Sequence, residues 1–259
     1  LVFQYINKAI FSTRRPLAHA KELLPFIVSV VFFILSIAIC YKGLKNLHLD
    51  LEFSNVLLIA FVMGILGFFL SKVLVRYIPD DDSKDFAHQF NTTENLFKYL
   101  QILTAFYIAF AHGSNDVANA VGPLAAVVSI LDGGVVGMKV AMPIWILGLG
   151  GGFIVFGLMV WGYRVMATVG ENITDITPSR GFCATFGAAS VVLICSKMGL
   201  PISTTHTLVG SIIGVGLARG LPTLNLGIIK MIFISWVTTI PFTAIISMIF
   251  FKAFLLFLP

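Results

Sequence analysis

One acidic residue lies deep inside an apolar stretch of this 259-residue sequence. It is Asp116, whereas the other Asp and Glu residues fall in polar loops or at the ends of apolar segments. A carboxylate in such surroundings needs a cation, a proton or a basic side chain as its partner. Asn115 and Asn119 are four residues apart, and Asn119 is three from Asp116, so we expect neighbouring positions on a helix. By analogy with other hard cations, their oxygens predict a site for Na⁺.

Three consecutive hydroxyl residues follow a proline in a second apolar stretch. Pro201 has no N–H and ends or opens the helix that precedes it. Ser203, Thr204 and Thr205 can then cap a new helix. The N-terminus of such a helix presents unpaired N–H groups and the positive end of the dipole, which favours an anion. The alternative is that the hydroxyls join helices, as Ser and Thr often do in membranes.

Two histidines lie beside these two segments, and the residues leave their roles open. His112 precedes Asp116, and His206 follows the hydroxyl run. Either imidazole could contact a ligand or make a structural hydrogen bond. Ser203 with His206 also resembles the nucleophile and base of an intramembrane enzyme. Such a site needs a third, orienting group, and Asp116 could supply it only if the fold brings the two segments together.

The composition indicates an integral membrane protein. Hydrophobic residues make up 58% of the chain and charged residues 11%, against about 25% charged residues in soluble domains. The net charge of +5 comes from basic residues scattered between apolar runs, so no nucleic-acid partner is expected. Lipid is the expected partner. The three cysteines lie in apolar runs without metal-ligand spacing, and we interpret them as packing residues.

The apolar stretches predict an all-α membrane fold with interrupted helices. A transmembrane helix needs about 20 apolar residues. We expect a juxtamembrane segment at 1–23, two transmembrane helices within 24–75, a polar cytoplasmic loop at 76–95 and a transporter repeat at 96–259. That repeat contains helices broken at 112–116 and 199–206, and Pro241 could kink or end its last helix. Two broken or re-entrant helices are typical of secondary transporters, which bind ligands near the midplane.

Lysine and arginine in the short loops predict the orientation. The N-terminal segment and the loop after the second span carry more of them than the loop between the first two spans. Cytoplasmic loops are enriched in Lys and Arg. We therefore expect the N-terminal segment and the polar loop at 76–95 on the cytoplasmic side.

The two interrupted segments carry motifs that resemble those of a known family. Residues 113–120 read Gly-Ser-Asn-Asp-Val-Ala-Asn-Ala, and residues 199–206 read Gly-Leu-Pro-Ile-Ser-Thr-Thr-His. Both are similar to signatures of the inorganic phosphate transporter (PiT) family, and residues 170–181 resemble the segment that links them. The resemblance is strong over residues 96–220 and rests on hydropathy elsewhere.

The resemblance implies roles for individual residues. It places phosphate at Ser203, Thr204 and Thr205, with Asn115 beside them. It places the coupling cation, the one metal ion expected, at Asp116 and Asn115. Asn119, from its helical spacing, and Ser203 are further candidates for binding the cation. Na⁺ or H⁺ is then the coupling ion, and no cofactor is expected.

The chain departs from the family pattern in three ways. Members carry both motifs twice, in two inverted repeats, whereas this sequence has each motif once. We therefore expect one half of an inverted-repeat architecture, whose missing first repeat is a partner; a homodimer is left open. Thr185 stands where some members have a Glu, and Lys197 replaces a more usual small or neutral residue.

The functional hypothesis is symport of inorganic phosphate with Na⁺ or H⁺ by alternating access, in a multi-pass protein of a cell inner membrane or an organelle inner envelope. No covalent chemistry is needed, so we do not expect an enzyme. The alternatives are a sulfate permease of the same fold, a metal–phosphate substrate and a membrane subunit that does not transport.

Overall fold

The computed structural model describes residues 1–43, 51–78, 85–131, 143–200 and 202–257, and within these ranges the chain is helical with no strand. The α-helices in chain order are α1 (Val2–Ile6), α2 (Pro16–Ala38), α3 (Phe53–Arg76), α4 (Phe86–Leu131), α5 (Ile144–Glu171), α6 (Pro178–Lys197), α7 (Thr204–Leu217) and α8 (Leu226–Phe257). Six of the described helices are long and apolar enough to cross a membrane, namely α2 to α6 and α8. The all-α, multi-pass prediction is confirmed.

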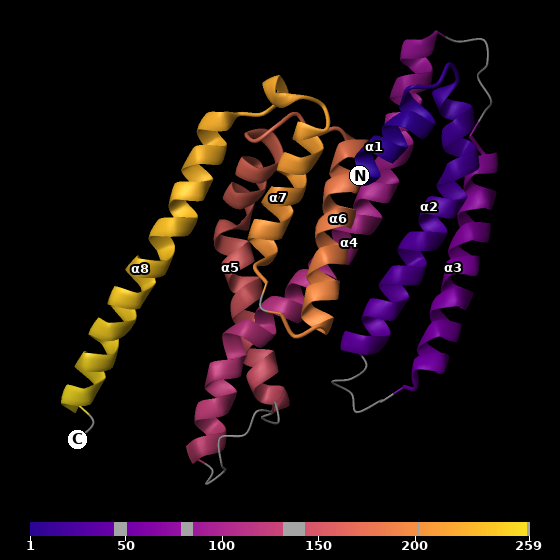
Figure 1. Cartoon of the computed structure of the whole chain (residues 1–259). Coiled ribbons are helices and arrows are strands. Elements are labelled where there is room, and N and C mark those ends of the chain that lie inside the picture. Colours follow the sequence, from indigo (N-terminus) through magenta and orange to yellow (C-terminus); the bar gives the residue numbers. More distant parts are fainter. Residues whose placement is uncertain (44–50, 79–84, 132–142, 201, 258–259) are drawn as a thin grey trace.

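The first two long helices form an antiparallel hairpin, seen at one side of Figure 1. α2 begins at Pro16 rather than at the predicted Leu24, because proline at the first position of a helix loses no hydrogen bond. The helices approach closely at Gly67, where a Cβ atom would lie 3.0 Å from the Phe32 ring. Small residues permit such close packing between membrane helices.

The helix that carries Asp116 differs from the prediction. α4 runs for 46 residues through positions 112–116 without an unwound segment, and it begins at Phe86, inside the predicted polar loop. At 1.5 Å per residue it is about 69 Å long, roughly twice the bilayer core. Figure 1 shows α4 changing direction near the tip of α6. The predicted break is therefore a bend, because the polar side chains there find partners without opening the backbone.

The second predicted break is real and joins α6 to α7 as a re-entrant hairpin. Both ends of this hairpin lie at the same end of the molecule (Figure 1). Hydrogen bonds fix this arrangement, since Asn225 N–H donates to the Ile173 carbonyl (3.0 Å) and Thr174 Oγ1 donates to the Thr223 carbonyl (2.9 Å). The segments before α6 and after α7 are thus joined, and the turn between the helices lies at the opposite end of the hairpin, where most of the described residues are exposed.

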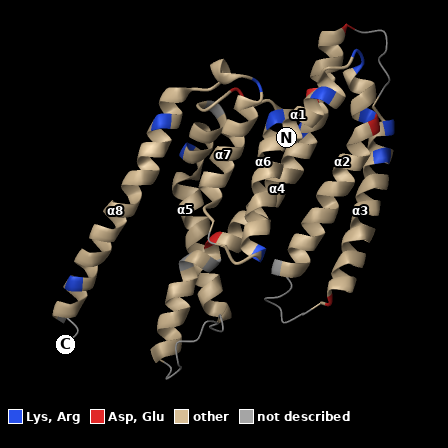
Figure 2. Cartoon of the chain, viewed as in Figure 1, with Lys and Arg blue, Asp and Glu red and all other residues tan. Residues whose placement is uncertain are grey.

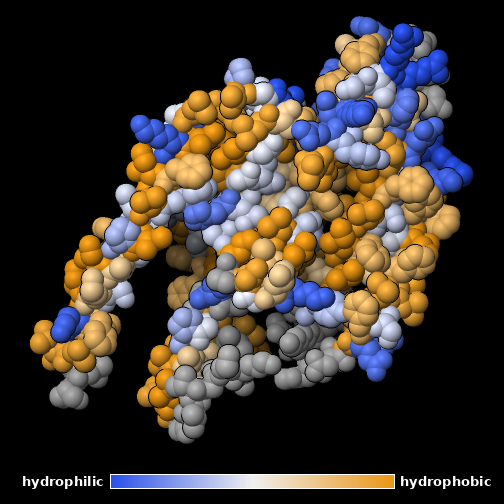
Figure 3. Space-filling model, viewed as in Figure 1, coloured by the Kyte–Doolittle hydropathy of each residue, from blue (hydrophilic) through white to orange (hydrophobic). Residues whose placement is uncertain are grey.

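The last helix is the most exposed of the long helices. α8 continues through Pro241, which neither ends the helix nor divides it. Figure 3 shows a largely hydrophobic surface over α8 and over the α2–α3 hairpin. None of the apolar window of α8 is buried against described residues. Such a surface suits lipid or further protein.

The basic residues gather at one end of the bundle. Figure 2 shows most of the Lys and Arg residues near the N-terminus, at the end where α2 and α6 begin and where α3 and α7 finish. Lys21 Nζ donates to the Ile78 carbonyl there (2.6 Å) and joins α2 to the end of α3. This end carries the segments that the Lys and Arg count predicts to be cytoplasmic, and the orientation stays a prediction.

Candidate functional site

The turn at the tip of the re-entrant hairpin is built from local signals in the sequence. α6 ends in a Schellman motif, in which Leu200 N–H donates to the Cys195 carbonyl (2.9 Å) and Gly199 N–H to the Ser196 carbonyl (3.3 Å). Gly199 has φ of 71°, a left-handed conformation that glycine adopts readily. α7 then begins at Thr204 with Ser203 as its N-cap, whose Oγ accepts from His206 N–H (3.3 Å). The sequence-based prediction of a new helix here is confirmed.

Asn115 fastens this turn to α4. Its side chain is 6% exposed, and its amide Nδ2 donates to the Ile202 carbonyl and to Asp116 Oδ1, both at 3.0 Å. The two amide hydrogens are therefore committed. Ile202 lies in the break, where a carbonyl has no partner within a helix. Asn115 thus fixes the hairpin tip against α4 across 87 residues of sequence.

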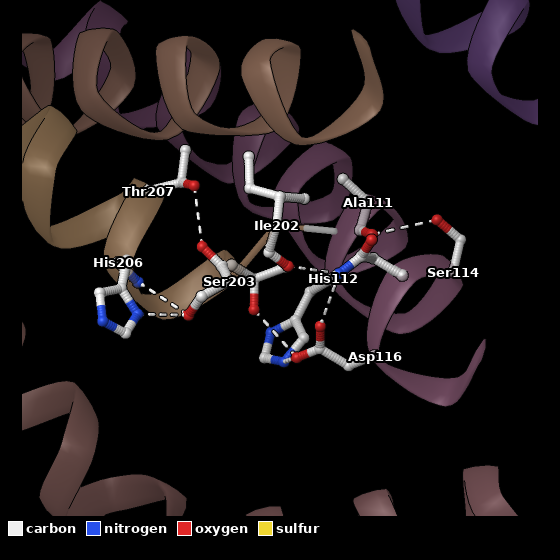
Figure 4. Close-up of polar contacts among 10 residues, drawn as sticks. Ala111, His112, Ser114, Asp116, Ile202, Ser203, His206 and Thr207 are labelled. Atoms are coloured by element: carbon white, nitrogen blue, oxygen red, sulfur yellow. Dashed lines mark hydrogen bonds and ion pairs between the residues drawn. The ribbon is translucent and has the colours of Figure 1, made fainter. Parts of the chain in front are cut away.

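The Asp116 carboxylate is held by three side chains (Figure 4). Besides the Asn115 amide at Oδ1, its Oδ2 accepts from Thr204 Oγ1 (2.9 Å) and lies 2.6 Å from His112 Nε2. Thr204 is 4% exposed, whereas the Asp116 side chain is 31% exposed. The carboxylate therefore has protein partners on one side and open space on the other.

That open space is a pocket of about 410 Å³ between α4 and the start of α7. Small-molecule sites have volumes of about 300–1,000 Å³. The described residues that line it are Asp116, Asn119, Ile202, Ser203, Thr204 and Thr205. All of the predicted site residues except Asn115 therefore meet at one pocket, and Asn115 lies behind it.

The charge distribution of the pocket is mixed. The first turn of α7 brings backbone N–H groups without helical partners and the positive end of a 14-residue helix. The hydroxyls of Ser203 and Thr205 lie at this end, and both residues are exposed. Asp116 supplies a negative charge at the opposite wall. Among the described residues, no cluster of three or more His, Cys, Asp or Glu side chains could hold a metal ion.

Comparison with known proteins identifies the family. Residues 1–247 match the sequence model of the phosphate transporter family. This chain belongs to that family.

Relatives in the phosphate transporter family extend well beyond this chain. A protein of Haemophilus influenzae that carries the name of a phosphate permease is 44% identical over 96% of the chain and 60% of its own length. The chloroplastic inorganic phosphate transporter 2-1 of Arabidopsis thaliana is 51% identical over 62% of the chain and 28% of its own length. A solved structure of a sodium-dependent phosphate transporter, 41% identical, covers 92% of the chain with a TM-score of 0.79, and 57% of that structure is matched. The chain thus spans about 60% of the length of relatives such as the Haemophilus protein.

The geometry of Ser203, His206 and Asp116 and the family of the chain both argue against the enzyme alternative. His206 Nδ1 contacts Ser203 Oγ, but Asp116 bonds to His112 and Thr204 rather than to His206. A hydrolytic triad needs the acid on the second nitrogen of the same histidine. The phosphate transporter family and the structural neighbour are transporters, not enzymes.

The two departures from the family motifs lie outside the pocket lining. Thr185 Oγ1 lies 2.7 Å from Thr104 Oγ1 in the interface between α4 and α6. Lys197 Nζ lies over the ring of Tyr41, 4.2 Å from its centroid, in the helical turn Ile39–Gly43 that follows α2. Both residues join helices in this member of the phosphate transporter family.

The sequence interpretation missed two residues that position the site. Glu94, taken as part of a loop, lies inside α4 and accepts hydrogen bonds from Ser179 N–H (2.9 Å), Ser179 Oγ (2.8 Å) and Thr177 Oγ1 (3.0 Å) at the start of α6. Trp236 of α8 stacks on the His206 ring. No local signal indicated the contacts of Glu94, because its partners lie 83 and 85 residues away in the sequence. No local signal indicated the contact of Trp236.

Proposed function

We propose that this chain forms part of a transporter that carries inorganic phosphate across a membrane together with a cation, by alternating access. The observation that carries the proposal is one pocket with an anion-favouring wall and a cation-favouring wall. The N-terminus of α7, with Ser203 and Thr205, faces the same space as Asp116 and Asn119. The names of the relatives and of the structural neighbour support phosphate as the substrate.

Electrostatics supports coupling between the two ions. A phosphate at the start of α7 would lie near the Asp116 carboxylate. Two unit charges of like sign about 5 Å apart repel by about 3 kcal/mol at an effective dielectric constant of about 20. That energy corresponds to roughly a hundredfold loss of affinity. A cation between the carboxylate and the phosphate would remove the repulsion, so each ion promotes binding of the other.

The hydrogen bonding of Thr204 also supports coupling between the two ions, with the cation binding first. Its hydroxyl has one hydrogen, and without ligands that hydrogen goes to Asp116 Oδ2. A cation bound to Oδ2 would take the place of this donor, and the Thr204 hydroxyl would then be free for a phosphate oxygen. Cation binding thereby completes the anion site. We propose Na⁺ as the cation, because the structural neighbour is a sodium-dependent transporter and neutral oxygens with one carboxylate suit a hard cation.

Membrane energetics gives the reason for coupling. Moving one negative charge inward against 100 mV costs about 2.3 kcal/mol. Co-transported cations offset this cost. The end of the bundle rich in Lys and Arg is proposed to face the cytoplasm, and the re-entrant hairpin would then enter the membrane from that side.

The test is phosphate uptake into proteoliposomes by the full-length protein, first with an imposed Na⁺ gradient and then with an imposed pH gradient. Uptake driven by the Na⁺ gradient and lost in Asp116→Asn is the expected result. Thr243→Val is the matched control, because among the described residues the Thr243 hydroxyl bonds only within α8 (2.8 Å to the Thr239 carbonyl and 3.0 Å to the Ile240 carbonyl). Uptake driven only by the pH gradient would replace Na⁺ by H⁺. Preferential uptake of sulfate, or none of either anion by folded protein, would overturn the proposal.

A further inference from the structure

His206 connects the pocket to the last helix. Its Nδ1 lies within hydrogen-bonding distance of Ser203 Oγ, and its backbone N–H donates to the same oxygen (3.3 Å). On the other side, its ring stacks on Trp236 of α8, with centroids 3.9 Å apart and planes at 34°. Figure 4 shows His206 and Ser203 in contact, with Asp116 at the far side of Ser203. One imidazole therefore contacts both a pocket hydroxyl and an indole.

The hydroxyl of Ser203 cannot donate a hydrogen bond to the His206 ring and to an anion at the same time. It has one hydrogen and two lone pairs, and one lone pair accepts from the His206 N–H. In the empty pocket the hydrogen can point to Nδ1, which then carries a lone pair. When an oxyanion takes that hydrogen, Nδ1 keeps its contact with Ser203 by donating to the second lone pair, for which the neutral ring gains a proton at Nδ1 and loses its Nε2 proton to solvent. An anion at Ser203 therefore fixes the tautomer and orientation of the His206 ring.

α8 is placed to respond to the ring. Its partly buried side chains that pack against the rest of the molecule are Ile228, Ile229, Ile232 and Trp236, all in its first three turns. From Val237 to Leu256 nearly all residues are exposed. Trp236 is thus the point where α8 leaves its neighbours, and Pro241 follows five residues later. Proline removes a helix hydrogen bond and permits bending there.

We propose that His206 is a positioning residue that couples phosphate binding at Ser203 to α8 through Trp236. Phosphate draws the Ser203 hydrogen into the pocket, the His206 ring takes the donor role at Nδ1, and the stack on Trp236 changes. The position of α8 beyond Trp236 then depends on whether the site is occupied. This inference rests on the proposed function, because phosphate must reach Ser203.

Two substitutions separate the two contacts of the ring. His206→Phe keeps an aromatic ring for Trp236 and removes the nitrogen that faces Ser203. His206→Asn keeps a nitrogen or oxygen near the position of Nδ1 and removes the stack. The proposal expects both variants to bind phosphate and both to transport it with a lower kcat. A role limited to capping α7 would leave His206→Asn normal and would not make α8 sensitive to phosphate.

The experiment uses Trp236 as its own reporter. The full-length protein is prepared with Trp236 as its sole tryptophan, which includes Trp145→Phe and Trp161→Phe on α5, where both indoles are exposed. Inorganic phosphate is titrated with Na⁺ present, and Trp236 emission and bound radioactive phosphate are measured together. A second protein with Trp161 as its sole tryptophan is the control for changes unrelated to the stack.

The expected result is a saturable change in Trp236 emission that follows phosphate binding and is lost in His206→Phe, while Trp161 emission stays constant. Phosphate binding with no change in Trp236 emission would overturn the coupling role and leave the proposed function intact. An unchanged response in His206→Phe would do the same. Absence of phosphate binding to the folded protein would overturn both proposals.

Discussion

Thr204 donates a hydrogen bond to Asp116 Oδ2 at 2.9 Å across 88 residues of sequence. This bond joins the first residue of α7 to the carboxylate of α4. Because the hydroxyl carries a single hydrogen, the bond that holds the empty pocket together competes with any bond to an anion. Thr204 is therefore the residue through which cation binding at Asp116 is expected to affect anion binding.

Replacement of Thr204 by Val is therefore expected to weaken phosphate binding and Na⁺ dependence together. Valine keeps the shape and removes the donor, and loss of a hydrogen bond to a charged group costs about 1.5–3 kcal/mol, or roughly a tenfold to hundredfold rise in KM. Thr204→Ser should restore most of the activity. Uptake at varied phosphate and Na⁺ concentrations measures both effects. An unchanged KM in Thr204→Val would contradict this role.

Asp116→Asn is expected to separate phosphate binding from the cation. The amide removes the like-charge repulsion of about 3 kcal/mol and also the charge that attracts Na⁺. Phosphate binding should become insensitive to Na⁺, and uptake against a concentration gradient should disappear. Equilibrium binding of radioactive phosphate with and without Na⁺ gives the first result, and proteoliposome uptake gives the second. Retention of Na⁺-dependent binding would exclude Asp116 as the coupling residue.

Asn115→Asp and Asn115→Ala are expected to loosen the tip of the hairpin. Both remove the amide that donates to the Ile202 carbonyl, and Asp adds repulsion between acceptor oxygens. The Ile202 carbonyl is partly buried, and leaving it without a partner costs at most about 1–3 kcal/mol. Thermal unfolding in lipid nanodiscs should show the loss, and hydrogen exchange should rise at residues 202–207. Asn119→Ala is the control, because Asn119 is exposed at the pocket.

The sequence was sufficient where a local signal decides the structure. Pro201 with the following hydroxyl residues placed the start of α7, because proline and N-cap residues act within one turn. The isolation of Asp116 among apolar residues placed it at the pocket, because a membrane charge needs partners and space. The assignment of phosphate and cation to individual pocket residues stays a prediction, as do the inverted repeat and the domain limits.

The sequence was insufficient where contacts between residues far apart in the chain decide the structure. Positions 112–116 were expected to break the helix, yet α4 continues because Asn115 and Asp116 find their partners in Ile202 and Thr204, 87 and 88 residues later. The contact between His206 and Trp236 depends on how α8 packs, which no local pattern specifies. Hydropathy also misplaced the start of α2, because Lys21 and Glu22 lower the apolar character of its first turns.

Glu94 is expected to stabilise the fold rather than act in transport. Its carboxylate accepts from Ser179 and Thr177 at the N-terminus of α6, where a negative charge is also favoured by the helix dipole. Glu94→Ala should lower the stability by about 1–3 kcal/mol, and Glu94→Gln by less because one acceptor oxygen remains. Thermal unfolding is the measurement, with the exposed Glu22→Gln as control. A changed KM for phosphate with unchanged stability would contradict this assignment.

Lys197 is expected to hold the α6–α7 re-entrant hairpin to the α2–α3 hairpin through Tyr41. The ammonium lies 4.2 Å from the ring centroid, and a cation–π contact contributes about 0.5–2 kcal/mol, depending on desolvation. Lys197→Met keeps the apolar stem and removes the charge, whereas Tyr41→Leu removes the ring. A double-mutant cycle on thermal stability should give a coupling energy of that size. Additive effects of the two substitutions would mean that the contact contributes nothing to stability. Lys197→Arg is the control, because it keeps a cation able to stack on the ring and should leave the stability unchanged.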